Sequence, residues 1–196
     1  MSILSPEQLL DLKASGLNDA TIAALGVVAV RPHDLPVKAA QSAYRIPYFD
    51  LNGAINGFHR LKFVPPVHTS KGLLKYYQTP GSSPHLYLPP LLAWRAVAIN
   101  SKVRLTITEG EKKAASACQH GLITAGVSGT WCWRSTLDNG DRLTLQVLDE
   151  FLWPNRSVLI CPDSDAWTED NKGFQILSGF LPWARSYDSV GPMSGS

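Results

Sequence analysis

The chain has 196 residues, of which 44% are hydrophobic and 17% charged, a balance that is typical of a globular protein and excludes a disordered one. No apolar run is long enough to cross a bilayer, and the N-terminus lacks a secretory signal pattern, so we expect a cytoplasmic protein without membrane contact. The net charge of +2 is unevenly divided: residues 1–105 hold 11 Lys and Arg against 5 Asp and Glu, and residues 106–196 hold 7 against 11. A basic half beside an acidic half suits a nucleic-acid surface that leads to a metal site, and it equally suits two ordinary subdomains.

The first thirty residues predict a helical hairpin. Ser5 and Gln8 frame a helix start, and Gly16 ends that helix. Asn18 caps a second short helix over residues 20–25. Hairpins of this kind hold DNA phosphates in some proteins and are packing or docking elements in more of them, so both roles stay open.

The next segment, residues 31–102, predicts a small basic subdomain rich in β-structure. Four strands are expected, at residues 44–49, 55–63, 75–78 and 85–88. Basic side chains are interleaved with aromatic ones here, and single-stranded nucleic acids are bound through basic groups on phosphates and aromatic rings under bases. A sheet with aromatic residues inward and charges outward shows the same alternation. The candidate nucleic-acid contacts in this segment are Arg45, His59, Arg60, Lys62 and Lys75.

A parallel α/β arrangement is predicted from residue 103 onward. A buried strand over residues 105–108 ends on Glu109, Gly110 makes a turn, and a helix follows to about residue 120. A second strand is expected at 122–127 and a helix at 143–152. The last expected elements are a strand that ends on Asp163 and Asp165, a helix at 171–185, an edge strand at 187–190 and a flexible tail at 191–196.

Lys112 and Lys113 stand in the first turn of the helix that follows Gly110. Cations at this end oppose the helix dipole, so their presence indicates an anionic partner, such as a phosphate or Glu109 itself. A solvated helix face is the alternative. We therefore include both lysines among the candidate nucleic-acid contacts.

Three carboxylates follow buried strands of the predicted sheet: Glu109, Asp163 and Asp165. Functional groups gather at the carboxyl ends of parallel strands, and Asp163 and Asp165 share a face because they are two residues apart. Their mutual repulsion is relieved by a hard cation such as Mg²⁺, which prefers oxygen ligands. The sequence therefore predicts a metal site here, with ordinary helix-start and turn roles as the alternative.

The combination of a strand ending in Glu109-Gly110 before a helix, and a later strand ending in Asp163-x-Asp165, resembles the Toprim domain of primases, topoisomerases and related nucleases. The amino-acid sequence of residues 107–114 and 163–166 is most similar to that of Toprim-like domains of plasmid and phage replication proteins, including primase-helicase relatives. Residues 46–81 also resemble the small subdomain that precedes Toprim in phage-type primases. One departure is Lys113, because many Toprim domains place an acid four residues after the first Glu.

The resemblance implies a Rossmann-type parallel sheet flanked by helices over residues 103–190, preceded by the helical hairpin (1–30) and the β-rich subdomain (31–102). It implies Glu109, Asp163 and Asp165 as catalytic residues and as ligands of Mg²⁺ or Mn²⁺. We expect a protein of plasmid or phage DNA replication that binds single-stranded or duplex DNA and carries out primase-like, Mg-dependent phosphoryl transfer. The alternatives are a metal-dependent nuclease and a non-catalytic module that binds nucleic acid, a replication helicase or a defence protein. Lys113 favours the module, and the presence of Glu109, Asp163 and Asp165 favours the enzyme.

Overall fold

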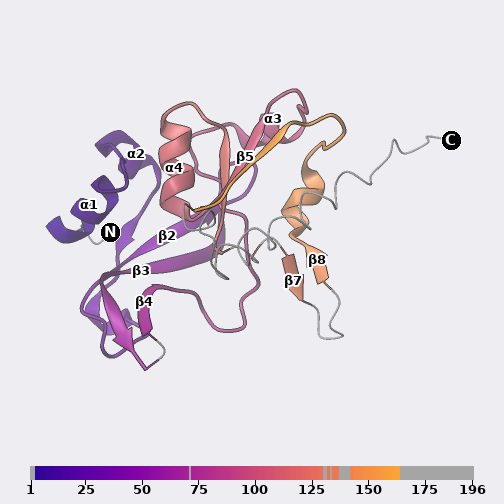
Figure 1. The fold of residues 1–196 in the computed structure, drawn as a ribbon. Helices are drawn as coiled ribbons and strands as arrows, with labels where there is room; N and C mark the ends of the chain where they lie inside the picture. The colour runs from indigo at the N-terminus through magenta and orange to yellow at the C-terminus, as the bar shows by residue number, and fades with distance from the viewer. Residues whose placement is uncertain (1–2, 71, 130–131, 133, 137–141, 164–196) are drawn as a thin grey trace, which may run out of the picture.

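The structure is a computed structural model that describes residues 3–70, 72–129, 132, 134–136 and 142–163 (Figure 1). Its strands form an antiparallel sheet of order β1-β2-β3-β4, a parallel sheet of order β6-β5-β9 and a two-stranded ladder of β7 and β8. The predicted fold class is confirmed, because a parallel sheet with a helix packed on it follows a β-rich unit and a helical hairpin. None of the helices in the described ranges is long and apolar enough to cross a membrane.

The N-terminal hairpin folds as predicted, with α1 (Pro6–Lys13) and α2 (Asp19–Ala24). A capping box opens α1, in which the Ser5 hydroxyl accepts from the Gln8 N–H and the Gln8 side chain accepts from the Ser5 N–H. The Asn18 side chain caps α2 by accepting from the N–H of Thr21. These local bonds satisfy helix ends that have no partner within the helix, which is why the sequence pattern predicts them well.

The antiparallel sheet consists of β1 (Val28–Ala29), β2 (Ala43–Phe49), β3 (Ile55–Thr69) and β4 (Gly72–Tyr77). Three of the predicted strands are confirmed, although β3 continues to Thr69, and β1 and the short 3₁₀ turn η1 (Pro32–Asp34) were not predicted. The strand expected at 85–88 is wrong. Only Tyr87 pairs there, in a single bridge to Gly126, because prolines at 84 and 89 have no N–H to donate on either side.

The parallel sheet has β5 (Leu105–Glu109) at its centre, with β6 (Thr124–Val127) and β9 (Val158–Cys161) beside it. Helix α4 (Glu111–Gln119) joins β5 to β6, as predicted. The elements that were not predicted are α3 (Trp94–Ala98), β7 (Arg134–Thr136) and β8 (Arg142–Thr144). The 3₁₀ helix η2 (Gln146–Glu150) lies inside the helical segment predicted over residues 143–152. The helix at 171–185, the strand at 187–190 and the tail lie outside the described residues.

The helical segment predicted over residues 143–152 is confirmed only over residues 146–150, where it is a 3₁₀ helix rather than an α-helix, and its apolar spacing explains why. Leu145, Leu148 and Phe151 are all buried, and the N–H of each of the last two donates to the carbonyl three residues earlier. A spacing of three places these side chains on one side of a 3₁₀ turn, whereas the same residues also fit the apolar stripe of an α-helix. The sequence pattern alone does not separate the two.

The apolar interior forms three clusters, and α4 has a face in two of them. Its Cys118 belongs to a cluster under the parallel sheet that includes Trp94 and Ile107. Its Ala114 and Ala115 belong to a second cluster, formed with the hairpin and β2, whose other members include Leu12, Leu17, Tyr44, Ile46 and Tyr48. Figure 1 shows α4 beside both the hairpin and β5. Helix α4 is therefore held in place by both halves of the chain.

Candidate functional site

The turn after β5 is built on two glycines. Gly110 has a φ of +95°, a conformation that residues with a side chain rarely adopt, and α4 begins directly after it. On the neighbouring strand, a Cβ at Gly126 would lie 2.9 Å from the carbonyl oxygen of Gly110. The N–H of Gly110 donates to the carbonyl of Val127 at 2.8 Å. This close packing fixes the carboxyl end of β5, and with it the backbone of Glu109.

The structure brings Glu109 and Asp163 to the same edge of the parallel sheet. Thr108 pairs with Cys161 across β5 and β9, and the Thr108 hydroxyl donates to the Cys161 carbonyl at 2.9 Å. Both carboxylates line one cavity of about 620 Å³, in which Asp163 is ion-paired with Lys113. Asp165 lies outside the described residues. Within the described ranges, no group of three His, Cys, Asp or Glu side chains that could hold a metal is present.

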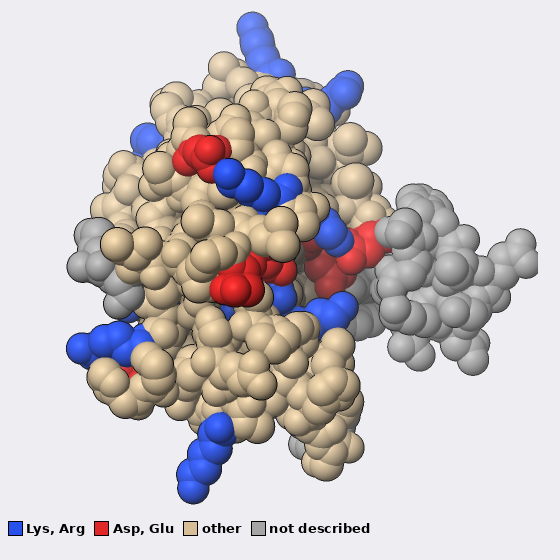
Figure 2. Space-filling model, turned by 90° about the vertical axis from the view of Figure 1, so that its left-hand side faces the viewer, with Lys and Arg blue, Asp and Glu red and all other residues tan. Residues whose placement is uncertain are grey.

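We call this space the junction cavity, because the hairpin, both sheets and α4 all contribute to its wall. Five of the predicted nucleic-acid contacts line it. The lining residues are Asp11, Ser15, Arg60, Lys62, Pro66, Lys75, Tyr76, Glu109, Gly110, Glu111, Lys112, Lys113, Ser128 and Asp163. Figure 2 shows acidic and basic side chains side by side around a hollow in the middle of this face, rather than in separate patches.

A buried ion pair crosses the junction cavity between β3 and α4. Arg60 Nη1 donates to Glu111 Oε1 at 2.7 Å, and the hydroxyl of Tyr48 donates to the same oxygen at 2.6 Å. The Glu111 side chain is only 2% exposed and that of Arg60 is 12% exposed. Burial lowers the pKa of Arg60, but the charges and hydrogen bonds of Glu111 and Tyr48 together outweigh burial, and the pKa is raised. Burial, followed by the nearby Glu111 charge, raises the pKa of Tyr48 well above its usual value.

A second group of charges joins the hairpin to the cavity. Asp11 on α1 accepts from Lys112 Nζ at 2.8 Å and from the Tyr44 hydroxyl at 2.7 Å, and it lies 3.6 Å from Lys62 Nζ. Lys62 and Arg60 also lie over the ring of Tyr76, at 5.3 and 4.9 Å from its centre. For Lys75, the described residues provide no ion pair. Of the five cavity cations, four therefore have a carboxylate partner.

Some buried polar atoms of this site have no hydrogen-bond partner among the described residues. Glu111 Oε2, Arg60 Nε and Ser128 Oγ are buried and find no hydrogen-bond partner among the described protein atoms. Buried polar groups nearly always have a partner, so a water or a polar ligand is expected to complete this part of the cavity.

Sequence reasoning missed Asp11 and Glu111 as members of the site, and it gave Tyr44, Tyr48 and Tyr76 as aromatic residues interleaved with basic ones, not as partners of these carboxylates. Glu111 and Arg60 are 51 residues apart, and Asp11 and Lys112 are 101 apart. Pairs at such distances depend on how the sheets pack, and no local pattern signals them. The one hint in the sequence was the pair of lysines at the helix start, which indicated an anion nearby.

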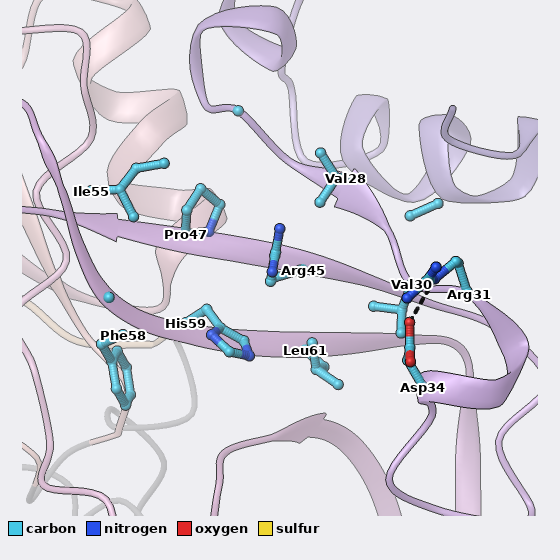
Figure 3. Close-up of a pocket in the computed structure, with 13 residues that line it drawn as sticks. Val28, Val30, Arg31, Asp34, Arg45, Pro47, Ile55, Phe58, His59 and Leu61 are labelled. Atoms are coloured by element: carbon cyan, nitrogen blue, oxygen red, sulfur yellow. Dashed lines mark hydrogen bonds and ion pairs between the residues drawn. The ribbon is translucent and has the colours of Figure 1, made fainter. Parts of the chain in front are cut away.

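Arg45 and His59 lie in a separate pocket of about 650 Å³ (Figure 3). Consecutive residues of a strand point to opposite faces, so Arg45 and His59 project away from the face that carries Arg60 and Lys62. Burial, followed by the charge of Arg45, lowers the pKa of His59. The seven predicted basic residues therefore line two different pockets, five of them in the junction cavity and two in this one.

Comparison with solved structures defines the class of fold. The chain is similar to a structure of the DnaG catalytic core, with a TM-score of 0.50 and 16% identity over 91% of this chain and 61% of that chain. It is also similar to a structure of the DnaG primase catalytic domain bound to ssDNA, with a TM-score of 0.51 and 15% identity over 93% of this chain and 64% of that chain. The chain thus shares its fold with these two structures, and it spans less than two thirds of the length of either one.

Sequence comparison adds one further finding. Residues 93–175 match a family described as a domain of unknown function, DUF3854. The match covers less than half of the chain. The comparison with curated proteins gives no match.

Proposed function

We propose that the chain binds single-stranded DNA in the junction cavity and acts in plasmid or phage DNA replication as a primase-like protein. The observation that carries the proposal is that one cavity gathers five cations beside Glu109 and Asp163, in a fold shared with primase cores. Lys and Arg side chains neutralise backbone phosphates, and carboxylates at the ends of parallel strands are suited to hold a hard cation.

The residues present fit Mg²⁺ or Mn²⁺, because Glu109 and Asp163 offer carboxylate oxygens at one sheet edge and Asp165 is two residues further on. When bound there, the cation supplies Lewis-acid neutralisation of charge on a transferring phosphate. Around it, Glu109 is our candidate general base or acid, and Lys75 and Lys113 are the exposed cations that would orient the DNA backbone.

The rival function is a non-catalytic module that binds DNA without phosphoryl chemistry. The ion pair between Lys113 and Asp163 favours it, because the ammonium group already neutralises one of the two described carboxylates. A metal ion at Asp163 has to displace this lysine. The two functions share the DNA interface and differ in their response to a divalent cation.

The DNA interface is tested by anisotropy with a labelled single-stranded oligonucleotide. Affinity should fall as salt rises, because bound counterions are released from the DNA. Lys75→Ala should weaken binding by a similar factor for different sequences, since phosphate contacts do not read bases. Lys102→Ala is the matched control, because Lys102 is an exposed lysine just before β5, at the opposite end of that strand from Glu109. Binding that is absent at low salt, or equal losses in the two variants, would refute the interface.

Thermal melting with Mg²⁺ or Mn²⁺ separates the enzyme from the module. A bound cation stabilises the folded state by about 2.7 kcal/mol at a hundredfold excess over its dissociation constant. Asp163→Asn and Glu109→Gln should abolish this gain, and Asp149→Asn, at an exposed carboxylate on η2, should retain it. Primer-forming activity that disappears with the gain supports the enzyme. If neither cation raises the melting temperature of the wild type, with or without DNA, the enzyme is refuted and the non-catalytic module is supported.

A further inference from the structure

The carboxylate of Asp11 lies where donors from three other elements converge. The Tyr44 hydroxyl on β2 and Lys112 Nζ on α4 both donate to Asp11 Oδ2, at 2.7 and 2.8 Å. Lys62 Nζ on β3 lies 3.6 Å from Asp11 Oδ1. Two ammonium groups and a hydroxyl around one pair of oxygens form the donor set that also binds a phosphate group. Asp11 therefore occupies an anion position of the junction cavity.

Asp11 is held as an anion. Partial burial raises the pKa of its carboxyl group, but the hydrogen bonds from Lys112 and Tyr44 and the charges of Lys112 and Lys62 outweigh burial, and the pKa is lowered. Two of the five cavity cations thus share the single carboxylate of Asp11 on the hairpin. A DNA phosphate that approaches these lysines meets a carboxylate already in place.

Asp11 differs from the deeply buried Glu111 in being partly open to solvent. The Asp11 side chain is 23% exposed, whereas that of Glu111 is 2% exposed. Rotation of Asp11 toward solvent leaves the hairpin docked, because Leu12 and Leu17 remain buried and Gln119 on α4 still bonds the backbone of the hairpin loop. The lysines can exchange one anion for another without unfolding of α1.

We propose that Lys62, Lys112 and Tyr44 form a phosphate subsite that Asp11 occupies with its own carboxylate, and that an entering backbone phosphate displaces Asp11. The proposal rests on the proposed DNA interface and deepens it, because it assigns a regulating anion to that interface. In the resting protein Asp11 lowers affinity for any short or weakly charged ligand. A strand that also reaches Lys75 and Lys113 is held by two further positive charges, which offset the exchange.

The test compares two substitutions that remove one negative charge from the same hairpin. Asp11→Asn keeps the shape of the side chain and removes the competing anion. Asp19→Asn is the matched control, because Asp19 pairs with Lys13 at 2.8 Å, is 80% exposed and does not line the cavity. Each variant is first checked for a cooperative thermal melt, and Asp11→Ala serves as a second variant without the side-chain oxygen. Binding of labelled oligothymidylate is then measured over a salt series.

Asp11→Asn should tighten binding roughly fivefold, the upper range for release of a partly exposed ion pair, and Asp19→Asn should stay within about twofold of wild type. The salt slope should steepen by about 0.7 for each additional phosphate that the freed lysines neutralise. Adding Lys112→Met to Asp11→Asn should reverse the tightening. If Asp11→Asn and Asp19→Asn change the DNA affinity equally, the change reflects only the lower negative charge of the protein. Weaker binding by Asp11→Asn would make it a residue that orients the lysines, and either result overturns the subsite.

Inorganic tripolyphosphate provides a second test of the phosphate subsite that does not depend on DNA binding. Calorimetric titration should show tighter binding to Asp11→Asn than to Asp19→Asn or wild type. If no variant binds DNA but Asp11→Asn binds tripolyphosphate more tightly, the proposed function fails and the subsite stands. If DNA binds to wild type but neither probe distinguishes the two variants, the proposed function stands and the subsite fails.

Discussion

At the scale of single residues, Glu111 joins three elements through one carboxylate. It is the first residue of α4, and it accepts from Tyr48 on β2 and Arg60 on β3. Because its side chain is 2% exposed, its charge is balanced by Arg60 and not by water. The pair fixes the antiparallel sheet against the start of α4, next to the turn that positions Glu109.

Glu111→Gln should destabilise the protein strongly. The change leaves the guanidinium group of Arg60 buried without a counter-charge, and loss of one partner of a buried pair costs about 3–5 kcal/mol. Urea denaturation measures this as a fall in the free energy of unfolding. Lys13→Met provides the comparison, because it breaks the exposed pair with Asp19 and should cost about 0–1 kcal/mol. A loss at Glu111 no larger than that at Lys13 would contradict the structural role given to the buried pair.

Residue-scale features were predictable where the signal is local. Ser5 and Gln8 indicate a helix start, and Glu109-Gly110 before a helix indicates the turn at the end of β5. The partners of Arg60 and Lys62 were not predictable, because they depend on which strand faces which helix. The sequence indicated phosphate contacts at these positions, and the structure shows that carboxylates lie against both side chains.

At the scale of elements, successive side chains of β2 and β3 point to opposite sides, which gives the antiparallel sheet two chemically different faces. The face toward α4 carries Arg60 and Lys62, and the outer face carries Arg45 and His59. The strands themselves were predictable from the alternating side-chain types along the sequence. Which face of the sheet points toward α4 was not predictable, since both faces contain aromatic and basic residues. The packing of α4 decides which face becomes part of the junction cavity.

The outer face predicts a pH effect through His59. Burial and then Arg45 lower its pKa, so the folded state favours the neutral ring. The unfolded chain takes up a proton near the ordinary value of about 6.5. Stability is therefore unaffected by His59 above that pH and falls as the pH drops below it, toward the lowered folded pKa.

NMR titration of His59 and urea denaturation at several pH values check this expectation. Arg45→Ala should move the pKa of His59 upward, toward its ordinary value, while the part due to burial remains. His59→Gln should remove the corresponding loss of stability in mild acid. An unchanged His59 titration in Arg45→Ala would show that the two side chains do not influence each other across β2 and β3.

At the scale of the whole molecule, the α/β class and the order of its units followed from strand, turn and helix signals. The uneven charge of the two halves did not translate into separate surfaces. In the junction cavity Arg60 of the first half pairs with Glu111 of the second, and Lys112 of the second half pairs with Asp11 of the first. Figure 2 shows acidic and basic side chains mixed on the face toward the hairpin. A count of charges along the chain cannot show this, because the antiparallel sheet folds back onto the start of α4.

Because α4 packs on both sides, part of this chain cannot easily be transferred alone to another protein by recombination. The stretch that matches a sequence family begins at residue 93, yet Ala114 and Ala115 are covered by apolar residues from the hairpin and β2. A recombination event that moved only this stretch into another gene would carry Glu109 without the surface that buries α4. The transplanted piece would persist only where its new host supplied an apolar cover, and a positive charge to replace Arg60 beside Glu111. The stretch that matches the family is therefore shorter than the part of the chain that buries α4.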